Sequence, residues 1–536
     1  MAHFRSYILI GIAGMLCIGI GISQPQKFYP DDPLEADPAP SPVGEVKRVK
    51  IYDLFDFFYQ SGRQKLRQSL PAQATTTLGE VPDSLWFTNR HGKRRMTREA
   101  LQRGPGNESA PQPPFVIVGA KSEGITPGFR MRDAKGRLYF VKPDPATNPE
   151  MSTGADVVGS KFFYAIGYNT PENYIAAISN SNWTVDKKAI ITGPDKISRR
   201  MVRHDLRDIL AHAARSRDGS YRIMASLAVP GRDIGPFRYE GTRLDDPNDI
   251  VPHEDRRDLR GLFVFCAWLN HTDAKGANSL NALVREGGIS FIRHYLIDFG
   301  SAFGSDGDAA KDARFGNAYQ IPPAGDTFRS ILGLGFYSPR WERADYPGMK
   351  AAGRIESRTF DPERWKPNYP NPAFLSRKPD DEYWAAKIVM AFSDNDIRAL
   401  VETGEYSDPR VVDHLVATLA ERRDKIGRAY FSKVLPLDVF RVTDGELRFE
   451  DLAVRYKFAP ARDYKISWSE FNNAGGTTKP LQEETSFQLP ARFVSAAGPE
   501  YVAATIQTST DGHKTVTVYL RKNGSSFDVV GIERTW

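Results

Sequence analysis

Asn-His-Thr-Asp-Ala-Lys-Gly-Ala-Asn at residues 270–278, with His-Tyr-Leu-Ile-Asp-Phe-Gly at residues 294–300, decides the fold of this chain. Asp273 and Asn278 lie five positions apart, and Asp298 follows an apolar run and precedes Phe-Gly. Phosphoryl transfer requires such a set, because one carboxylate orients the attacking hydroxyl and accepts its proton. An amide oxygen and a second carboxylate can hold the magnesium ion that neutralises the nucleotide phosphates. The two motifs therefore predict Asp273 as a general base and Asn278 and Asp298 as metal ligands.

A predicted hairpin connects the two motifs. Residues 279–284 and 289–297 have the length and composition of strands, and Arg-Glu-Gly-Gly at residues 285–288 predicts the turn. Each motif alone is weak, since Asp298 by itself is equally well explained as a turn residue after a strand. The hairpin strengthens the prediction, because it brings Asn278 and Asp298 to the same edge of a cleft.

These residues resemble the catalytic and metal-binding loops of the protein-kinase-like superfamily. Asp-Ala-Lys-Gly-Ala-Asn is similar to the Asp-x-Lys-x-x-Asn form of Ser/Thr kinases, which implies a catalytic role for Lys275 beside Asp273. The chain has Thr272 instead of the arginine of the typical His-Arg-Asp, and it has no Ala-Pro-Glu after Asp-Phe-Gly. It therefore looks closer to the HipA-like, lipid-kinase-like and secretory-pathway kinases. The resemblance implies a bilobal α+β core with ATP and Mg²⁺ as cofactors.

A kinase-like N-lobe is expected over residues 113–231. Residues 130–142 predict two short strands about an Asp-Ala-Lys-Gly turn, and Lys142 ends the second strand. The resemblance implies that a lysine at this place contacts the α and β phosphates, for which a compact ammonium group is suited. The alternative is an ordinary exposed lysine at a strand end. The glycines before these strands do not form Gly-x-Gly-x-x-Gly, and Lys121 is a candidate to assist them in phosphate binding.

The helical pattern over residues 149–167 occupies the place of helix C, which in the family supplies an acid to pair with the strand lysine. Two residues compete for this role. Glu150 lies in the first turn, where an acid also complements the helix dipole. Asp156 lies further into the helix but has a shorter side chain. We favour Asp156 and keep Glu150 as the alternative.

The N-terminus predicts export. Arg5 precedes an apolar run over residues 7–22, and small residues after it offer a cleavage site, which predicts a signal peptide over residues 1–23. The expected location is periplasmic or secreted, and membrane contact is expected only if the segment is an uncleaved anchor. Cys266 is the only cysteine beyond this segment, so no disulfide is expected within the mature chain. The net charge of +6 is spread along the chain and does not imply a nucleic-acid partner.

Composition divides the remaining chain into four parts. Residues 24–49 are rich in proline and acids and predict a disordered linker, and residues 50–112 form an N-terminal extension. Residues 232–433 predict a helical C-lobe, in which the irregular stretch 301–379 occupies the place of an activation segment and substrate surface. Short alternating strands over residues 434–536 predict an accessory β-sandwich-like domain.

Three functions are compatible with these residues. The first is an exported ATP- and Mg²⁺-dependent phosphotransferase that acts on a protein, glycan or lipid acceptor. The second is a pseudokinase scaffold without catalysis, favoured by the scarcity of ATP outside the cytoplasm but opposed by the complete set of polar site residues. The third, transfer of AMP, would use the same site. Residues 51–92, 124–129 and 167–171 also resemble exported bacterial proteins of uncharacterised function, a resemblance that implies no activity.

Overall fold

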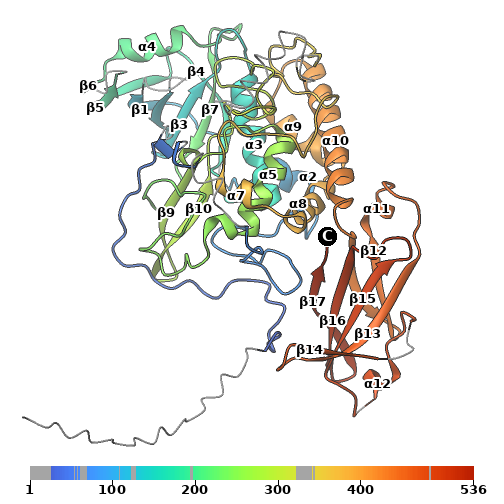
Figure 1. The fold of residues 1–536 in the computed structure, drawn as a ribbon. Helices are drawn as coiled ribbons and strands as arrows, with labels where there is room; N and C mark the ends of the chain where they lie inside the picture. Colours follow the sequence, from blue (N-terminus) through green and yellow to red (C-terminus); the bar gives the residue numbers. More distant parts are fainter. Residues whose placement is uncertain are drawn as a thin grey trace, which may run out of the picture.

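The computed structural model combines a sheet lobe, a helical lobe and a C-terminal β region (Figure 1). It describes residues 26–52, 55–56, 58–60, 69–107, 109–121, 128–193, 197–320, 341, 344–481, 485–495 and 497–536. The expected class, an α+β core of two lobes followed by an all-β region, is confirmed. The predicted signal peptide lies outside the described residues.

A seven-stranded sheet, in the order β4-β7-β3-β2-β1-β5-β6, forms the first lobe. Its strands are β1 (Phe115–Lys121), β2 (Gly128–Arg132), β3 (Leu138–Pro143), β4 (Asn173–Ile178), β5 (Trp183–Thr192), β6 (Ser198–Arg200) and β7 (Tyr221–Leu227). Side chains alternate along β3: Tyr139 and Val141 pack with α4 (Arg203–Ala211) into one core. Lys142 therefore points to the opposite face, toward α3 (Met151–Ile166).

The helical lobe packs around α5 (Arg257–Leu269), every residue of which is buried. The other helices are α2 (Arg98–Arg103), α7 (Pro372–Ser376), α8 (Pro379–Met390), α9 (Asp394–Val401) and α10 (Pro409–Phe431), with 3-10 turns η2 (His253–Asp255), η3 (Gly276–Asn278) and η5 (Glu402–Gly404). Helix α3 shares this core through Val158, Phe162 and Phe163, so one large cluster of apolar side chains joins the two lobes. Among the described residues no helix has the length and apolar character to cross a membrane.

The predicted hairpin between the two motifs is confirmed. Strands β9 (Ser279–Glu286) and β10 (Ile289–Leu296) pair antiparallel, and short β8 (Arg232–Asp233) pairs with β9. The turn residues Gly287 and Gly288 both have positive φ, 57° and 85°, which a two-residue hairpin turn of this type requires. Ser279 faces Leu296, so the residues just outside the hairpin, Asn278 and Ile297, are neighbours.

The C-terminal region contains two antiparallel sheets that share one core. A two-stranded sheet is formed by β11 (Leu437–Thr443) and β12 (Glu446–Asp451). A five-stranded sheet, in the order β14-β13-β15-β16-β17, is formed by β13 (Tyr464–Asn472), β14 (Thr477–Pro480), β15 (Tyr501–Thr508), β16 (Thr515–Asn523) and β17 (Ser526–Arg534). The short helices α11 (Leu452–Arg455) and α12 (Ala491–Val494) flank these strands. Buried side chains of both sheets, among them Leu437 and Trp468, pack together.

The segment expected to be a disordered linker contacts the folded chain at several points. The Phe28 ring is buried in the five-stranded sheet among the rings of Phe471, Tyr501 and Tyr519. Further along, Val46 is buried against Ile234 and Ile292, and Figure 1 shows the blue chain crossing from the β region toward β9 and β10. The physical reason is that apolar residues are spaced among the prolines, and two of them, Phe28 and Val46, fit apolar surfaces formed elsewhere.

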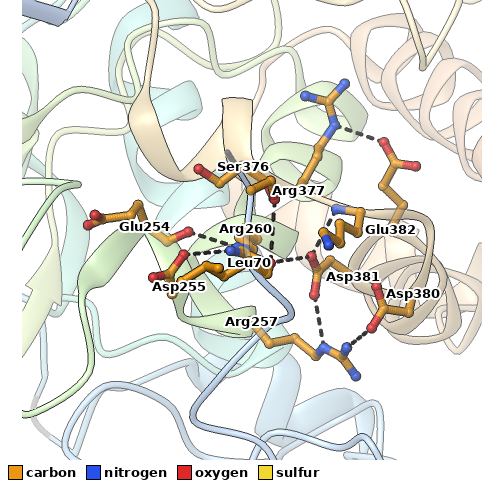
Figure 2. A network of polar contacts seen from close by, with 12 residues as sticks. Leu70, Glu254, Asp255, Arg257, Arg260, Ser376, Arg377, Asp380, Asp381 and Glu382 are labelled. Carbon is orange, nitrogen blue, oxygen red and sulfur yellow. Dashed lines mark hydrogen bonds and ion pairs between the residues drawn. The ribbon is translucent and has the colours of Figure 1, made fainter. Parts of the chain in front are cut away.

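A buried network of arginines and carboxylates joins α5 to α8 (Figure 2). The Arg260 side chain is fully buried and lies 2.7 Å from Asp255 and 3.4 Å from Asp381. Arg257 lies 3.0 Å from the other oxygen of Asp381. Arg260 also donates to the Leu70 carbonyl at 3.0 Å, which attaches the N-terminal extension to the helical lobe. Burial of charged groups is tolerated only when each has such partners.

Asp381→Asn is expected to lower the free energy of unfolding by about 3 to 5 kcal/mol, because it removes the charge that two buried arginines share. Asp413→Asn is the matched control: Asp413 pairs with Arg398 at 2.9 Å on the surface. Exposed pairs of this kind contribute at most about 1 kcal/mol. Guanidinium chloride unfolding followed by tryptophan fluorescence measures both variants, and equal unfolding midpoints would contradict the expectation.

Candidate active site

Lys142 lies between two carboxylates. Its Nζ atom is 2.6 Å from Asp298 Oδ1 and 3.5 Å from Asp156 Oδ2. Burial opposes the charge of this ammonium group, but the two carboxylates outweigh that effect and raise the pKa of Lys142 above its ordinary value. The Asp298 side chain is 43% exposed, so it is only partly desolvated; this desolvation opposes its ionisation, but the Lys142 charge outweighs it and lowers the Asp298 pKa. Both groups are therefore charged at neutral pH.

Helix α3 supplies Asp156 as the buried partner of Lys142. Asp156 Oδ1 accepts a hydrogen bond from the Phe299 backbone N–H at 2.8 Å, so this carboxylate also holds the loop that carries Asp298. A Cβ atom at Gly300 would lie 3.0 Å from Asp156 Oδ2, which is why a glycine suits that position. Burial, together with the nearby Asp298 charge, raises the pKa of Asp156 even though Lys142 opposes this.

Glu150 has a different position from Asp156. It precedes α3 in a left-handed conformation, with φ of 68°, and its Oε2 atom accepts a hydrogen bond from the Ser407 backbone N–H at 2.8 Å. The structure therefore brings Asp156 to Lys142 and places Glu150 at the boundary with the helical lobe. Lys121 is the last residue of β1, and its side chain lies outside the described part of the structure.

The loop after α5 places Asp273, Lys275 and Asn278 together. Asn270 caps the C-terminus of α5 in a left-handed conformation, which asparagine tolerates better than most residues. Asn278 Nδ2 donates to the Asp273 carboxylate at 2.8 Å and to its carbonyl oxygen at 2.9 Å. Lys275 Nζ lies 3.4 Å from the same carboxylate. The Asn278 amide nitrogen is thus used within the loop, and its amide oxygen is the atom left to face a ligand.

Asn278 and Asp298 fit the requirements of a magnesium ion bound together with a nucleotide. The Ile297 backbone N–H donates to the Asn278 carbonyl at 3.1 Å, so Asp298 follows directly beside Asn278. Both residues offer hard oxygen donors, and Mg²⁺ in such sites is held by one or two protein groups, substrate phosphates and water. No group of three or more His, Cys, Asp or Glu side chains in the described ranges could hold a metal. The phosphates of a nucleotide and water would complete the coordination of a metal held by Asn278 and Asp298.

A segment that the motifs did not single out supports the loop 270–278, which carries Asp273 and Asn278. Asn368 donates from its backbone to the Thr272 carbonyl at 2.7 Å and from its side chain to Asp273 at 3.3 Å. Trp365 Nε1 donates to Asn270 Oδ1 at 2.9 Å, and Asn371 Nδ2 donates to the Ala274 carbonyl at 3.2 Å. These residues lie about one hundred positions after the loop, so no local spacing links them to it. The sequence signal is weak: two asparagines, Asn368 and Asn371, lie among prolines in the run 365–372.

Comparisons with known proteins found similar solved structures only. No family model and no curated protein sequence matches the chain. The crystal structure of the Helicobacter pylori proinflammatory kinase CtkA is 11% identical, with a TM-score of 0.31, and the match covers 57% of this chain and 94% of that one. The Golgi casein kinase is 9% identical, with a TM-score of 0.31 and coverage of 75% and 96%. Its form with Mn/ADP bound is 10% identical, with a TM-score of 0.27 and coverage of 63% and 77%. At such TM-scores these likenesses to kinases carry no weight, and the geometry of the site decides the proposal.

Lys142→Met is expected to weaken ATP binding in the presence of Mg²⁺ by about 10- to 100-fold, since a charge-assisted hydrogen bond contributes about 1.5–3 kcal/mol. Lys188→Met is the matched control, because Lys188 is an exposed lysine on β5 of the same sheet. Isothermal titration calorimetry measures the affinity, and circular dichroism confirms the fold. Unchanged affinity in Lys142→Met would transfer the phosphate-binding role to Lys121.

Proposed function

We propose that the protein is a kinase-like phosphotransferase that uses ATP and Mg²⁺ to phosphorylate a hydroxyl group. One observation carries the proposal: the Lys142 ammonium of the sheet lobe lies 2.6 Å from Asp298, the neighbour of Asn278. This contact brings a phosphate-binding cation and two candidate metal ligands to one place. Asn278 in turn is hydrogen-bonded to Asp273, so the candidate base belongs to the same site.

Each of these side chains has a role that its contacts support. Asp273 would orient the acceptor hydroxyl and take its proton, and its hydrogen bonds with Asn278 and Asn368 fix the carboxylate for that task. Lys142 would turn from Asp298 toward the α and β phosphates, while Asp156 keeps the lysine in place. Lys275, 3.4 Å from Asp273, would place positive charge where the acceptor meets the γ-phosphoryl group. A Mg²⁺ ion held by Asn278 and Asp298 would supply neutralisation of the phosphate charge.

The proposed place of action is outside the cytoplasm, in the periplasm or the secreted fraction. The apolar run at residues 7–22 supports this part of the proposal. The acceptor is a hydroxyl group on a protein, glycan or lipid, because Asp273 as a base is suited to a hydroxyl nucleophile.

ATP is expected to raise the melting temperature of the full chain by several degrees only when Mg²⁺ is present, because the two metal ligands act through the metal. A ligand at 100 times its Kd stabilises a folded protein by about 2.7 kcal/mol. Asn278→Ala and Asp298→Asn are expected to abolish the Mg²⁺-dependent part of the shift. Differential scanning fluorimetry with Mg²⁺ or with EDTA measures it. Equal shifts with and without metal would count against both ligands.

Asp273→Asn is expected to abolish transfer while ATP and Mg²⁺ still bind, since the base acts on the nucleophile and other residues hold the metal. The protein is offered periplasmic extract and ATP, and mass spectrometry detects the modified product. Asp208→Asn, a change of an exposed aspartate on α4, is the control that should retain full transfer.

Three other outcomes would revise the proposed function. Equal labelling by wild type and Asp273→Asn would contradict the role of Asp273 as the base. An adenylylated product in place of a phosphorylated one would establish AMP transfer. No labelling by the wild type, with ATP still bound, would support the pseudokinase scaffold.

A further inference from the structure

Lys311 connects the two loops that carry the candidate base and the candidate metal ligand. It lies beyond the Asp-Phe-Gly motif, and only 1% of its surface is exposed. Its Nζ atom donates to Thr272 Oγ1 at 2.5 Å and to the Ser301 carbonyl oxygen at 2.5 Å. Thr272 directly precedes Asp273, and Ser301 follows three residues after Asp298. One ammonium group therefore bonds to both loops.

The backbone of Lys311 is held in place by its own segment. The Lys311 N–H donates to the Gly304 carbonyl at 2.8 Å, and an isolated bridge pairs Ser305 with Ala310. Gly304 has a φ of 79°, and a Cβ atom there would lie 2.1 Å from the backbone carbon of Arg354. Because the segment is packed this closely, the Lys311 side chain reaches the two loops from a fixed point.

The surroundings of Lys311 are charged and buried. Asp306 faces it from its own segment, Asp273 and His271 face it from the catalytic loop, and Cys266 faces it from α5. Burial lowers the pKa of the Lys311 ammonium to about 8, although the two aspartates oppose this. Burial and the Lys311 charge lower the pKa of His271 to about 4, and burial raises the pKa of the Cys266 thiol well above its ordinary value. A pKa of about 8 means that the Lys311 ammonium loses its charge as pH rises from 7 to 9, whereas His271 is already neutral in that range.

We propose that Lys311 is a positioning residue for phosphoryl transfer, which holds Asp273 and Asp298 in one relative position through Thr272 and Ser301. This inference rests on the proposed function. Typical protein kinases carry an arginine immediately before the catalytic aspartate, and phosphorylation often orders their following segment through new arginine contacts. Here Thr272 occupies that position, and the segment itself supplies the buried cation. In this arrangement Lys311 holds the two loops together without phosphorylation of the segment.

Lys311→Met is expected to lower kcat by about 100-fold, the effect of a small displacement of reacting groups, with the KM for ATP nearly unchanged. Lys311→Arg keeps a positive charge and hydrogen-bond donors for both acceptors. Its kcat is expected to be at least about tenfold higher than that of Lys311→Met. Lys350→Met, a change of an exposed lysine further along the same region, is the control that should match wild type. Equal kcat values in wild type and Lys311→Met would overturn the proposal.

The pH profile of kcat separates positioning from a merely structural role. Wild-type kcat is expected to fall as pH rises above about 8, because neutral Lys311 holds the two oxygen acceptors less strongly. Lys311→Arg should show no such fall up to pH 9.5, since its guanidinium group stays protonated. The same alkaline fall in wild type and in Lys311→Arg would overturn the assignment.

Hydrogen exchange at pH 7 tests the connection without measuring transfer. Lys311→Met is expected to increase amide exchange in residues 271–274 and 299–303 relative to wild type, with Lys311→Arg between them. Should Lys311→Met fail to fold, Thr272→Val is the substitute, because it removes only the hydroxyl acceptor. It should increase amide exchange in the same residues, by a smaller amount. Unchanged exchange in the folded variant would overturn the proposal. If the wild type transfers nothing, the proposed function fails, and the exchange result still decides whether Lys311 connects the loops.

Discussion

The Lys142 ammonium between Asp156 and Asp298 is the contact on which the rest of the site depends. It joins a strand of the sheet lobe, helix α3 and the loop after β10, three segments far apart in the sequence. Without this cation, two carboxylates would lie close together, and the buried Asp156 would have to take up a proton or lose its place. The same carboxylate holds the Phe299 backbone, so the charge balance at Lys142 also fixes the start of the following segment.

The two carboxylates around Lys142 differ in exposure, and this difference divides their roles. The Asp156 side chain is 2% exposed, whereas that of Asp298 is 43% exposed. A fully buried carboxylate is costly to separate from its cation, so Asp156 is suited to hold the lysine permanently. Asp298 can exchange its lysine contact for water or a ligand at much lower cost. Lys142 thus has a permanent partner in Asp156 and an exchangeable partner in Asp298.

Sequence alone predicted the parts of the site that depend on short spacings. The five-residue interval from Asp273 to Asn278, the hairpin with its Gly287-Gly288 turn and the acid on α3 are all local patterns. Asn368 and Lys311 were missed because they meet the catalytic loop from 95 and 39 positions away. Contacts between residues so far apart in the sequence leave no periodic pattern around Asn368 or Lys311 from which they could be predicted. Likewise, the proline-rich composition of residues 26–49 predicted disorder and did not indicate that the Phe28 side chain is buried in the β region.

The β region is attached to the helical lobe at a distance from the site residues. Lys387 on α8 lies 2.7 Å from Asp438 on β11, and it also pairs with Glu80 of the N-terminal extension. Arg534 on the last strand donates to the Leu437 carbonyl at 2.9 Å, beside the Tyr383 ring of α8. These contacts join the β region to α8 and the extension, whereas the site is built from β3, α3 and the loops around the hairpin (Figure 1). The Lys387 and Asp438 side chains are only 16% and 19% exposed, so this ion pair is largely shielded from water and fixes the β region to α8.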